Sequence, residues 1–557
     1  MRIFFTLFIF TYINSFSQGV FAPLNQDYYH LIDRYEVKSG KLSNNFHSNF
    51  KGYNRGSIIK LTDEIKPSNA RDSFNLAYLQ NDSWEWLSDE KISQSLSKKN
   101  ILKYFYSRKA DLIGYQNKEF DIHLNPVLHF GGGIDNVSSS RPFINSRGVE
   151  VRGMIARKLG FYSYLAENQV TNPHYVNELI RFYRGFPYEG FTKVIDSDTA
   201  KLRTDFFSAR GYIAFNPIKQ IQLHFGHDRN FIGSGMRSMI LSDFSSPYLQ
   251  LRMITHVGRV QYINIFGQLT NKQIPQPADG SIPLAPKYFA FHHLNYNLSK
   301  NLNIGIFETI VFGKRQIGFD LNYLNPVIFY RFVEGHLGSS DNSMVGLDFK
   351  YNFLKRFSMY GQLVLDEFKL AYLKERSGWW ATKISTQIGL KYIDFLEIPN
   401  LDVQVEFNLA RPYTYSHFSS FSNFANYNMP MAHPLGANFR EFLAQARFQP
   451  LKRLNLTASF SSARTGEDYD ATNWGGNILR NYLLLRPQDF GNVIGQGRRT
   501  NIIYFDFNAS YMLKHNLFLD FNALSRSYDS RETTLNHVNT SMSLGLRLNI
   551  ARRNLIF

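Results

Sequence analysis

Two hydrophobic periods divide the chain at about residue 118. Before it, apolar positions recur at helical spacing, and Tyr28, Leu31, Ile32 and Tyr35 fall on one face of a helix. Further short amphipathic candidates follow at 57–65, 68–87 and 101–112. After residue 118, apolar and polar residues alternate with the period of β-strands. The pattern therefore predicts a small helical region followed by a large β region.

The clearest alternating segment is 400–411. Its odd positions are apolar and its even positions are polar or charged: Leu401, Val403, Val405, Phe407 and Leu409 against Asp402, Gln404, Glu406 and Asn408. A soluble sandwich also alternates, but its strands are commonly about five or six residues long. Strands of about ten residues with charges in mid-strand favour a transmembrane barrel, whose apolar face meets lipid and whose polar face lines the lumen.

The spacing of these segments predicts the number of strands. At roughly 20–28 residues for each strand and its links, the region 119–557 holds about 16–20 strands, and about 18 segments can be counted. Long links predict outer loops at 169–200, 270–285, 412–436, 464–498 and 528–537. The predicted fold class is an all-β antiparallel transmembrane barrel with a small N-terminal α-helical periplasmic region.

The first 17 residues have the features of a signal peptide. Arg2 precedes an apolar core at 3–13 that is too short to span a bilayer, and Ser15 and Ser17 precede a cleavage site before Gln18. The predicted organisation is a signal peptide at 1–17, a helical periplasmic region at 18–118 that plugs the barrel mouth, and an outer-membrane barrel at 119–557. Because the chain has no cysteine, a lipoprotein anchor is excluded.

Composition agrees with this fold. The chain has 50 Phe and 33 Tyr, yet its mean hydropathy is −0.29, as expected when each lipid-facing residue is followed by a polar one. The absence of cysteine excludes disulfides, thiolate metal sites and a catalytic thiol. The net charge of +17 predicts an acidic surface polysaccharide or lipopolysaccharide as partner, besides the outer-membrane lipids. Nucleic acid is not expected for an exported barrel.

The sequence predicts no enzyme, cofactor or metal site. No phosphate-binding loop, zinc-protease motif or nucleophile elbow is present. His224 and His227 lie three residues apart near a strand end, so they point to opposite faces. The spacing of His336, Ser340 and Asp341 matches no hydrolase arrangement.

The densest polar stretch is 225–243, where glycines at 226, 233 and 235 interrupt the alternation. Two interpretations are open: an inward loop whose polar groups tie the wall together, or residues that contact a ligand. The candidates here are Asp228, Arg229, Asn230, Arg237 and Asp243. A second such stretch at 325–342 adds Arg331, Glu334 and Asp341, and a third adds Asp366 and Glu367 at the end of a strand.

Loop 412–436 is rich in aromatic residues among Ser and Asn. Tyr413, Tyr415, Phe418, Phe421 and Tyr427 are candidates for stacking on sugar rings. The alternative is a loop that packs on its own aromatic side chains.

The stretch also carries a family resemblance. Gly226, Asp228, Gly233, Gly235, Ser238, Leu241 and Ser242 resemble the signature of Wzi-type capsule assembly proteins. Asn325-Pro326 and the run 338–342 are similar to the branch of gliding motility proteins called RemB in Bacteroidota. The resemblance implies a lectin-like outer-membrane protein that holds capsular polysaccharide, with a helical region at the periplasmic mouth and an occluded barrel.

Several functions remain open from the sequence. The leading hypothesis is a non-enzymatic barrel that binds, retains or helps assemble surface polysaccharide, in support of gliding motility. The alternatives are a porin-like transport channel and a structural accessory of a secretion or motility complex. The last would recognise an envelope protein partner through its helical region.

Overall fold

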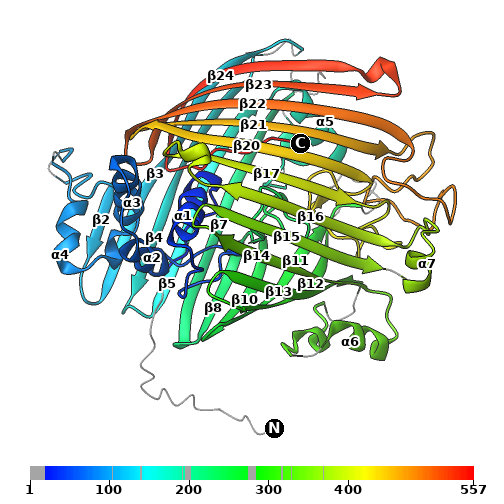
Figure 1. Cartoon of the computed structure of the whole chain (residues 1–557), viewed down its shortest axis with the longest axis horizontal. Helices are drawn as coiled ribbons and strands as arrows, with labels where there is room; N and C mark the ends of the chain where they lie inside the picture. The colour runs from blue at the N-terminus through cyan, green and yellow to red at the C-terminus, as the bar shows by residue number, and fades with distance from the viewer. Residues whose placement is uncertain are drawn as a thin grey trace, which may run out of the picture.

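A closed antiparallel β-barrel forms the body of the protein (Figure 1). The computed structural model describes residues 19–557 except 99, 103, 138–140, 191, 195–201, 274–283, 315–317, 328 and 368. The signal peptide predicted at 1–17 therefore lies outside the described residues. Within the described part, eighteen long strands pair with their neighbours around the barrel, and β24 closes it by pairing with β3. This confirms the predicted fold class and strand number.

The strands of the barrel wall are β3 Phe120–Asp135, β4 Phe143–Ile155, β5 Leu159–Thr171, β7 Arg203–Ile218, β8 Ile221–Asp228, β10 Tyr248–Val257, β11 Val260–Asn271, β12 Ala285–Asn297, β13 Leu302–Gly313, β14 Asn342–Phe353, β15 Phe357–Glu367, β16 Lys383–Tyr392, β17 Leu401–Ala410, β20 Phe439–Leu451, β21 Leu454–Glu467, β22 Arg498–Lys514, β23 Leu517–Ser530 and β24 His537–Leu548. Short strands accompany them: β2 Ile113–Gln116 on β3, β6 Lys193–Val194 on β7, and the pairs β1 Phe50–Lys51 with β9 Phe231–Ile232 and β18 Ala425–Asn426 with β19 Met429–Pro430.

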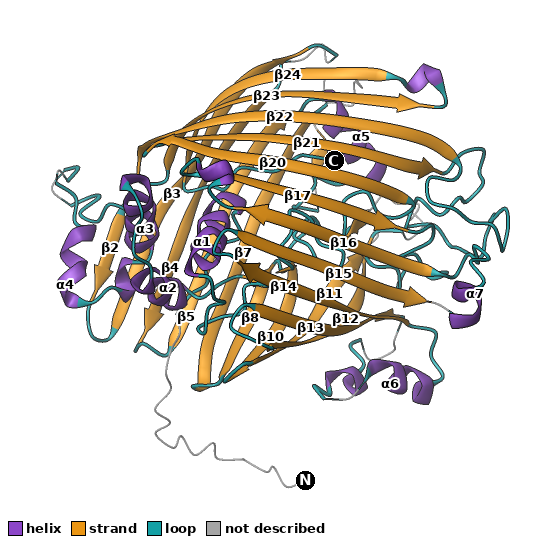
Figure 2. Ribbon diagram, in the orientation of Figure 1, coloured by secondary structure: helices purple, strands orange, loops and turns teal. Residues whose placement is uncertain are grey.

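The helices lie at the two ends of the barrel and against its wall (Figure 2). They are α1 Gln26–Ser39, α2 Arg55–Glu64, α3 Ala70–Asp82, α4 Asp89–Ile92, α5 His174–Tyr183, α6 Tyr330–Leu337 and α7 Leu370–Lys374, with short 3₁₀ turns at Trp84–Trp86, Ser93–Ser95, Leu321–Leu324, Phe395–Glu397 and Thr533–Leu535. In the described residues, no helix combines the length and the apolar character that crossing a membrane requires.

Strand β17 shows how the alternation builds the wall. Glu406 is 1% exposed and accepts hydrogen bonds from inside the barrel, whereas the neighbouring Phe407 faces outward and is 40% exposed. The same order holds in β22, where Asp506 is buried and Phe505 is exposed. Apolar side chains thus cover the outer surface, where they meet the lipid of the outer membrane.

Part of the lumen differs from the predicted polar lining. Ile263 and Ile265 of β11, and Phe289 and Phe291 of β12, point inward and are fully buried. They pack against two segments that enter the barrel: residues 229–247, called here the inward stretch, and loop 411–438. Because these strands face protein rather than water, burying apolar side chains on their inner face is favourable.

The N-terminal helical segment (residues 19–98) fits into the end of the barrel where the wall strands are joined by short turns (Figure 1). Asn25 caps α1 by accepting from the backbone N–H groups of Asp27 and Tyr28, and Gly40 ends the helix in the left-handed conformation. From α1, Asp33 and Glu36 reach Lys350 on the inner face of β14, with Glu36 2.5 Å away. The pair β1–β9 joins this segment to the inward stretch.

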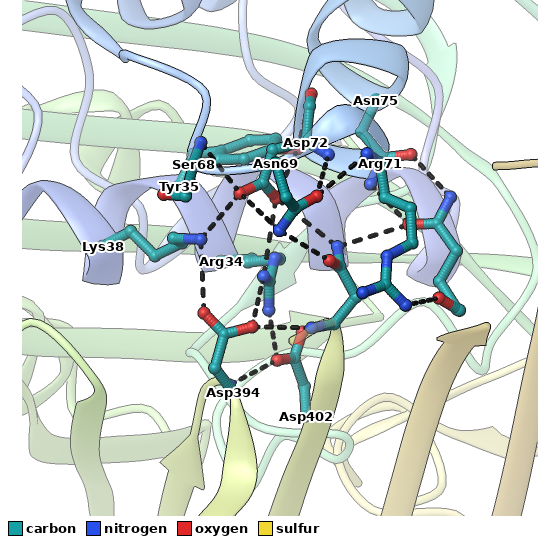
Figure 3. Close-up of polar contacts among 12 residues, drawn as sticks. Arg34, Tyr35, Lys38, Ser68, Asn69, Arg71, Asp72, Asn75, Asp394 and Asp402 are labelled. Atoms are coloured by element: carbon teal, nitrogen blue, oxygen red, sulfur yellow. Dashed lines mark hydrogen bonds and ion pairs between the residues drawn. The ribbon is translucent and has the colours of Figure 1, made fainter. Parts of the chain in front are cut away.

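Arg34 is the centre of the polar contacts that hold the helical segment (Figure 3). Its guanidinium, 1% exposed, pairs with Asp402 of β17 and donates to Asp394 at 2.5 Å and Asp72 at 3.5 Å. Lys38 adds contacts of 2.7 Å to Asp72 and 3.2 Å to Asp394. Burial alone would raise the pKa of Asp394, but Arg34 outweighs it and holds the pKa below its usual value. Through these contacts the three carboxylates bind α1 to α3 and to the wall.

Candidate functional site

The inward stretch leaves the wall where β8 ends. Gly233 has φ +122°, and a Cβ there would lie 2.3 Å from the Nε2 atom of Gln362, so only glycine fits. Gln362 of β15 then binds two backbone groups of the stretch. Its Nε2 donates to the Ile232 carbonyl at 2.9 Å, and its Oε1 accepts from the Met239 N–H at 2.7 Å.

Two of the predicted residues in this stretch tie it to the wall. The Asn230 amide is fully buried, donates to Tyr248 and Gln250 at 2.7 Å each, and accepts from Arg252. Arg237 pairs with Glu441 of β20 at 3.2 Å. Because their polar atoms are engaged inside the protein, the contacts of Asn230 and Arg237 fit the predicted inward loop that ties the wall together.

Three other predicted residues line cavities. Arg229 and Asp243 border a cavity of about 180 Å³ between the helical segment, the wall and the last residues of the chain, 549–554. Arg229 lies 5.8 Å from the ring of Tyr188. Asp228 borders a smaller cavity of about 10 Å³ and is 3.7 Å from His224. In the inward stretch, Arg229 and Asp243 border the larger cavity together with Phe231 and Gly235, and a lumenal ligand could reach them there.

The prediction that Arg331, Glu334 and Asp341 lie in the lumen is wrong. Arg331 and Glu334 belong to α6, which packs on the outer face of the wall over Ala290 and Ile310. Their 2.8 Å ion pair forms there, with Arg331 73% exposed. Asp341 accepts from Tyr323 at 2.8 Å on the same outer side. The sequence alternation cannot show to which side a long link folds, because the link itself has no period.

Asp366 and Glu367 lie at the end of β15, at the long-loop end of the barrel. Asp366 accepts from the backbone N–H of Tyr415 at 2.7 Å and so holds loop 411–438. Glu367 is half exposed and lies 3.3 Å from Lys383. Asp366 is thus a support of the loop, while Glu367 borders the surface.

Loop 411–438 folds into the mouth of the barrel, which changes the role of its tyrosines. Tyr413 and Tyr415 are each 1% exposed, and their hydroxyls donate to the carbonyls of Asn473 and Met239 at 2.8 and 2.6 Å. The prediction that these two rings stack on sugars is therefore wrong, because their faces are covered by protein. Phe421 and Tyr427 are partly buried, and Phe418 is 36% exposed.

Phe418 belongs to a row of six aromatic rings at the long-loop end. We call the row the aromatic patch: Phe490, Tyr372, Trp379, Trp380, Tyr482 and Phe418, with successive ring centroids 5.5, 5.1, 6.1, 4.9 and 6.2 Å apart. The rings come from three segments: 369–382, loop 411–438 and loop 468–497. Phe490 at the far end is 49% exposed. The patch is a row of contacting rings on the side of the barrel that faces away from the helical segment; Tyr482 is buried, and the other five rings are at least partly exposed.

Cations and backbone bonds hold the aromatic patch in place. The guanidinium of Arg486 lies 4.1 Å from the Trp380 ring, and Lys383 lies 4.2 Å from the Tyr482 ring. The Trp380 N–H donates to the Asp489 carbonyl at 2.8 Å, which joins two of the segments. Burial lowers the pKa of His417, beside Phe418, to about 3, so its imidazole is neutral at neutral pH.

Sequence reasoning missed most of this patch. Trp379 and Trp380 are two of the five tryptophans and follow Gly378 in a link that did not count as a long loop. An adjacent Trp pair in a surface link is a signal that could have been used. The sequence could not show that the three segments meet at one surface, because this depends on which strands are neighbours in the barrel.

Comparisons with known proteins agree with this architecture. Residues 145–507, more than half of the chain, match the family described as capsule assembly protein Wzi. A comparison with curated proteins found no match. A solved structure from Escherichia coli, Wzi, is described as an outer-membrane protein involved in group 1 capsule assembly and as a carbohydrate-binding β-barrel; it has a TM-score of 0.58 at 13% identity, over 96% of this chain and 100% of that one.

Other solved structures are more distant. OprD of Pseudomonas aeruginosa (TM-score 0.41, 9% identity, 77% and 92% of the two chains) and OccAB1 of Acinetobacter baumannii (TM-score 0.41, 10% identity, 77% and 96%) share too little of the fold to support an argument. The family match covers the inward stretch, α6 and all six rings of the aromatic patch. This chain is a member of the Wzi family of capsule assembly proteins.

Proposed function

We propose that this protein is a non-enzymatic outer-membrane barrel that binds capsular polysaccharide at the aromatic patch. The observation that carries the proposal is the unbroken row of six rings at the long-loop end, which faces outside the cell if short turns are periplasmic. Aromatic faces stack on the C–H faces of sugar rings. A row of rings can contact several sugars in succession, so it suits a polysaccharide better than a single sugar.

Two further observations support the proposal. The E. coli relative is itself described as carbohydrate-binding, which makes the same class of ligand the first to test. The net charge of +17 favours an acidic polymer over a neutral one. Arg486 and Lys369 lie against the rings and can face the carboxylates of such a polymer.

The test removes the two exposed rings at the ends of the patch. In the double variant Phe418→Ala/Phe490→Ala, we expect affinity for the purified capsular polysaccharide of the host to fall at least about tenfold, since each stacked ring is worth about 1 kcal/mol. Isothermal titration calorimetry on the barrel in detergent measures the affinity. On cells, the amount of polysaccharide released into the culture medium measures the loss of retention.

The matched control is Phe329→Ala/Phe332→Ala, which removes two exposed rings from the neighbourhood of α6. Its affinity should equal that of the native chain. Equal losses in the two double variants, or no loss in the first, would remove the aromatic patch as the binding site.

The narrower resemblance to gliding motility proteins supports a second part of the proposal, in which retained polysaccharide aids movement over surfaces. It rests on Asn325-Pro326 and the run 338–342. Gliding speed of a deletion strain, complemented by the native chain or by the Phe418/Phe490 variant, tests it.

A further inference from the structure

Three potential metal ligands meet at the long-loop end, away from the aromatic patch. His174 and Glu178 lie four residues apart on one face of α5, and His537 is the first residue of β24. Their ligating atoms all lie within 4.8 Å of one another. The Glu178 carboxylate is between the two rings, with Oε1 3.8 Å from His174 Nδ1 and Oε2 3.6 Å from His537 Nε2.

The two imidazole nitrogens that face Glu178 have no hydrogen-bond partner. His174 Nδ1 and His537 Nε2 are both shielded from solvent and unsatisfied, and distances of 3.6 and 3.8 Å are too long for hydrogen bonds. A buried polar atom without a partner costs about 1–3 kcal/mol. Both nitrogens are therefore placed to bind one group together with the Glu178 carboxylate.

The orientation of His537 agrees with a metal ligand. Its Nδ1 lies 2.9 Å from the Leu535 carbonyl and donates to it, so in the neutral ring Nε2 presents its lone pair toward Glu178. Its ring also stacks on Tyr528, with centroids 5.3 Å apart and planes inclined by 14°. Metal-binding histidines are held in this way, by donating the second N–H to a carbonyl or carboxylate.

We propose that His174, Glu178 and His537 bind a divalent transition metal, Zn²⁺ above all. Two imidazoles and one carboxylate are a common zinc ligand set, with the fourth tetrahedral position open to water. Ligands about 2.0–2.1 Å from such an ion lie about 3.4 Å apart. The two observed distances to Glu178, 3.6 and 3.8 Å, need to shorten by a few tenths of an ångström, while the two histidine nitrogens, within 4.8 Å of each other, approach by more than that if they are near this limit. The bound ion joins the α5 segment to the start of the last strand.

The test uses the full chain without a histidine tag, purified in detergent and freed of metal with EDTA. Titration with Zn²⁺ against a chromophoric chelator should show one tight site per chain. We expect His537→Gln and Glu178→Gln each to lower its affinity at least about tenfold. A Co²⁺ titration should give the visible absorption bands of a tetrahedral site in the native chain and not in these variants.

The control is His336→Gln, which removes an exposed histidine on α6 and should leave the affinity for Zn²⁺ unchanged. Hydrogen exchange of 174–183 gives a second measurement, since bound Zn²⁺ should slow it in the native chain alone. The proposal is overturned if the triple variant at 174, 178 and 537, folded as a barrel by its heat-modifiable gel mobility, binds Zn²⁺ as tightly as the native chain.

Discussion

At the scale of single residues, the helical segment depends on a few buried charges. Arg34 faces three carboxylates from α3, the turn after β16, and β17. A buried charge is tolerated only when its partners compensate it, so each member of such a group is sensitive to loss of the others.

Replacing Arg34 by Ala should loosen the helical segment. The change leaves Asp72 and Asp402 buried with less compensating charge, which we expect to cost about 3–5 kcal/mol. Hydrogen exchange of residues 26–39 should rise accordingly. Lys41→Ala breaks the exposed 2.8 Å pair with Glu64, and it should change the free energy of opening of the same residues by less than about 1 kcal/mol. A similar response to both variants would contradict the central role of Arg34.

His47 makes the same segment sensitive to acid. Burial lowers the pKa of His47 to about 4, with Asn295 and Asn297 as hydrogen-bond partners and Asp348, His256 and His293 as the nearby titratable groups. An unfolded histidine has a pKa of about 6.5, so the contribution of the neutral ring is complete above pH 6.5 and is lost as the pH falls toward 4.

At pH 5 we expect the free energy that holds the segment in place to be about 2 kcal/mol lower than at neutral pH. Hydrogen exchange of residues 41–53, corrected for intrinsic rates, should then be about 30-fold faster than at pH 7. In His47→Asn this pH dependence should largely disappear. If it persists in that variant, other groups cause it.

At the scale of elements, segments without a regular period close the lumen. The inward stretch, loop 411–438 and the last residues of the chain all enter the barrel. Arg526 donates to the Phe557 carbonyl at 3.0 Å, and Tyr175 of α5 donates to Leu555 at 3.0 Å. In both contacts a side chain of one element donates to a backbone carbonyl of the last residues, so they join elements that are distant in the sequence.

Gln362 offers a test of the inward stretch. Gln362→Leu keeps the side chain's size but leaves the Met239 N–H and the Ile232 carbonyl without a partner, at about 1–3 kcal/mol each. The native chain has no cysteine, so Ser238→Cys introduces one unique thiol in the stretch. We expect maleimide to label this thiol slowly in the Ser238→Cys variant and much faster when Gln362→Leu is added. The control adds Gln268→Leu, a change at an exposed position of the wall, and should leave the labelling rate unchanged. Equal rates in all three would show that Gln362 does not hold the stretch.

At the scale of the whole molecule, described segments enter the barrel from both ends. The helical segment occupies one end, and the inward stretch and loop 411–438 fill the other with a packed apolar core. We expect no steady ion conductance in planar bilayers, with a porin prepared in the same detergent as the positive control. Stable single-channel steps from the native chain would favour the transport alternative.

Much of the architecture could be predicted from the sequence. The alternation along 400–411 places polar or charged residues between apolar ones, and with strands of about ten residues it favours a barrel wall between lipid and lumen. The strand number followed from the spacing of such segments. The inward stretch was also visible, because glycines at 226, 233 and 235 break the alternation.

The sites could not be predicted in the same way. Arg331 lies outside the wall, Tyr415 is buried, and Trp380, Tyr482 and His537 gain their neighbours only when distant loops meet. The sequence by itself determined the barrel, because each strand's period is a local property. Only the tertiary structure decided what fills the lumen and which side chains share a surface, because barrel closure places residues side by side that no local pattern connects.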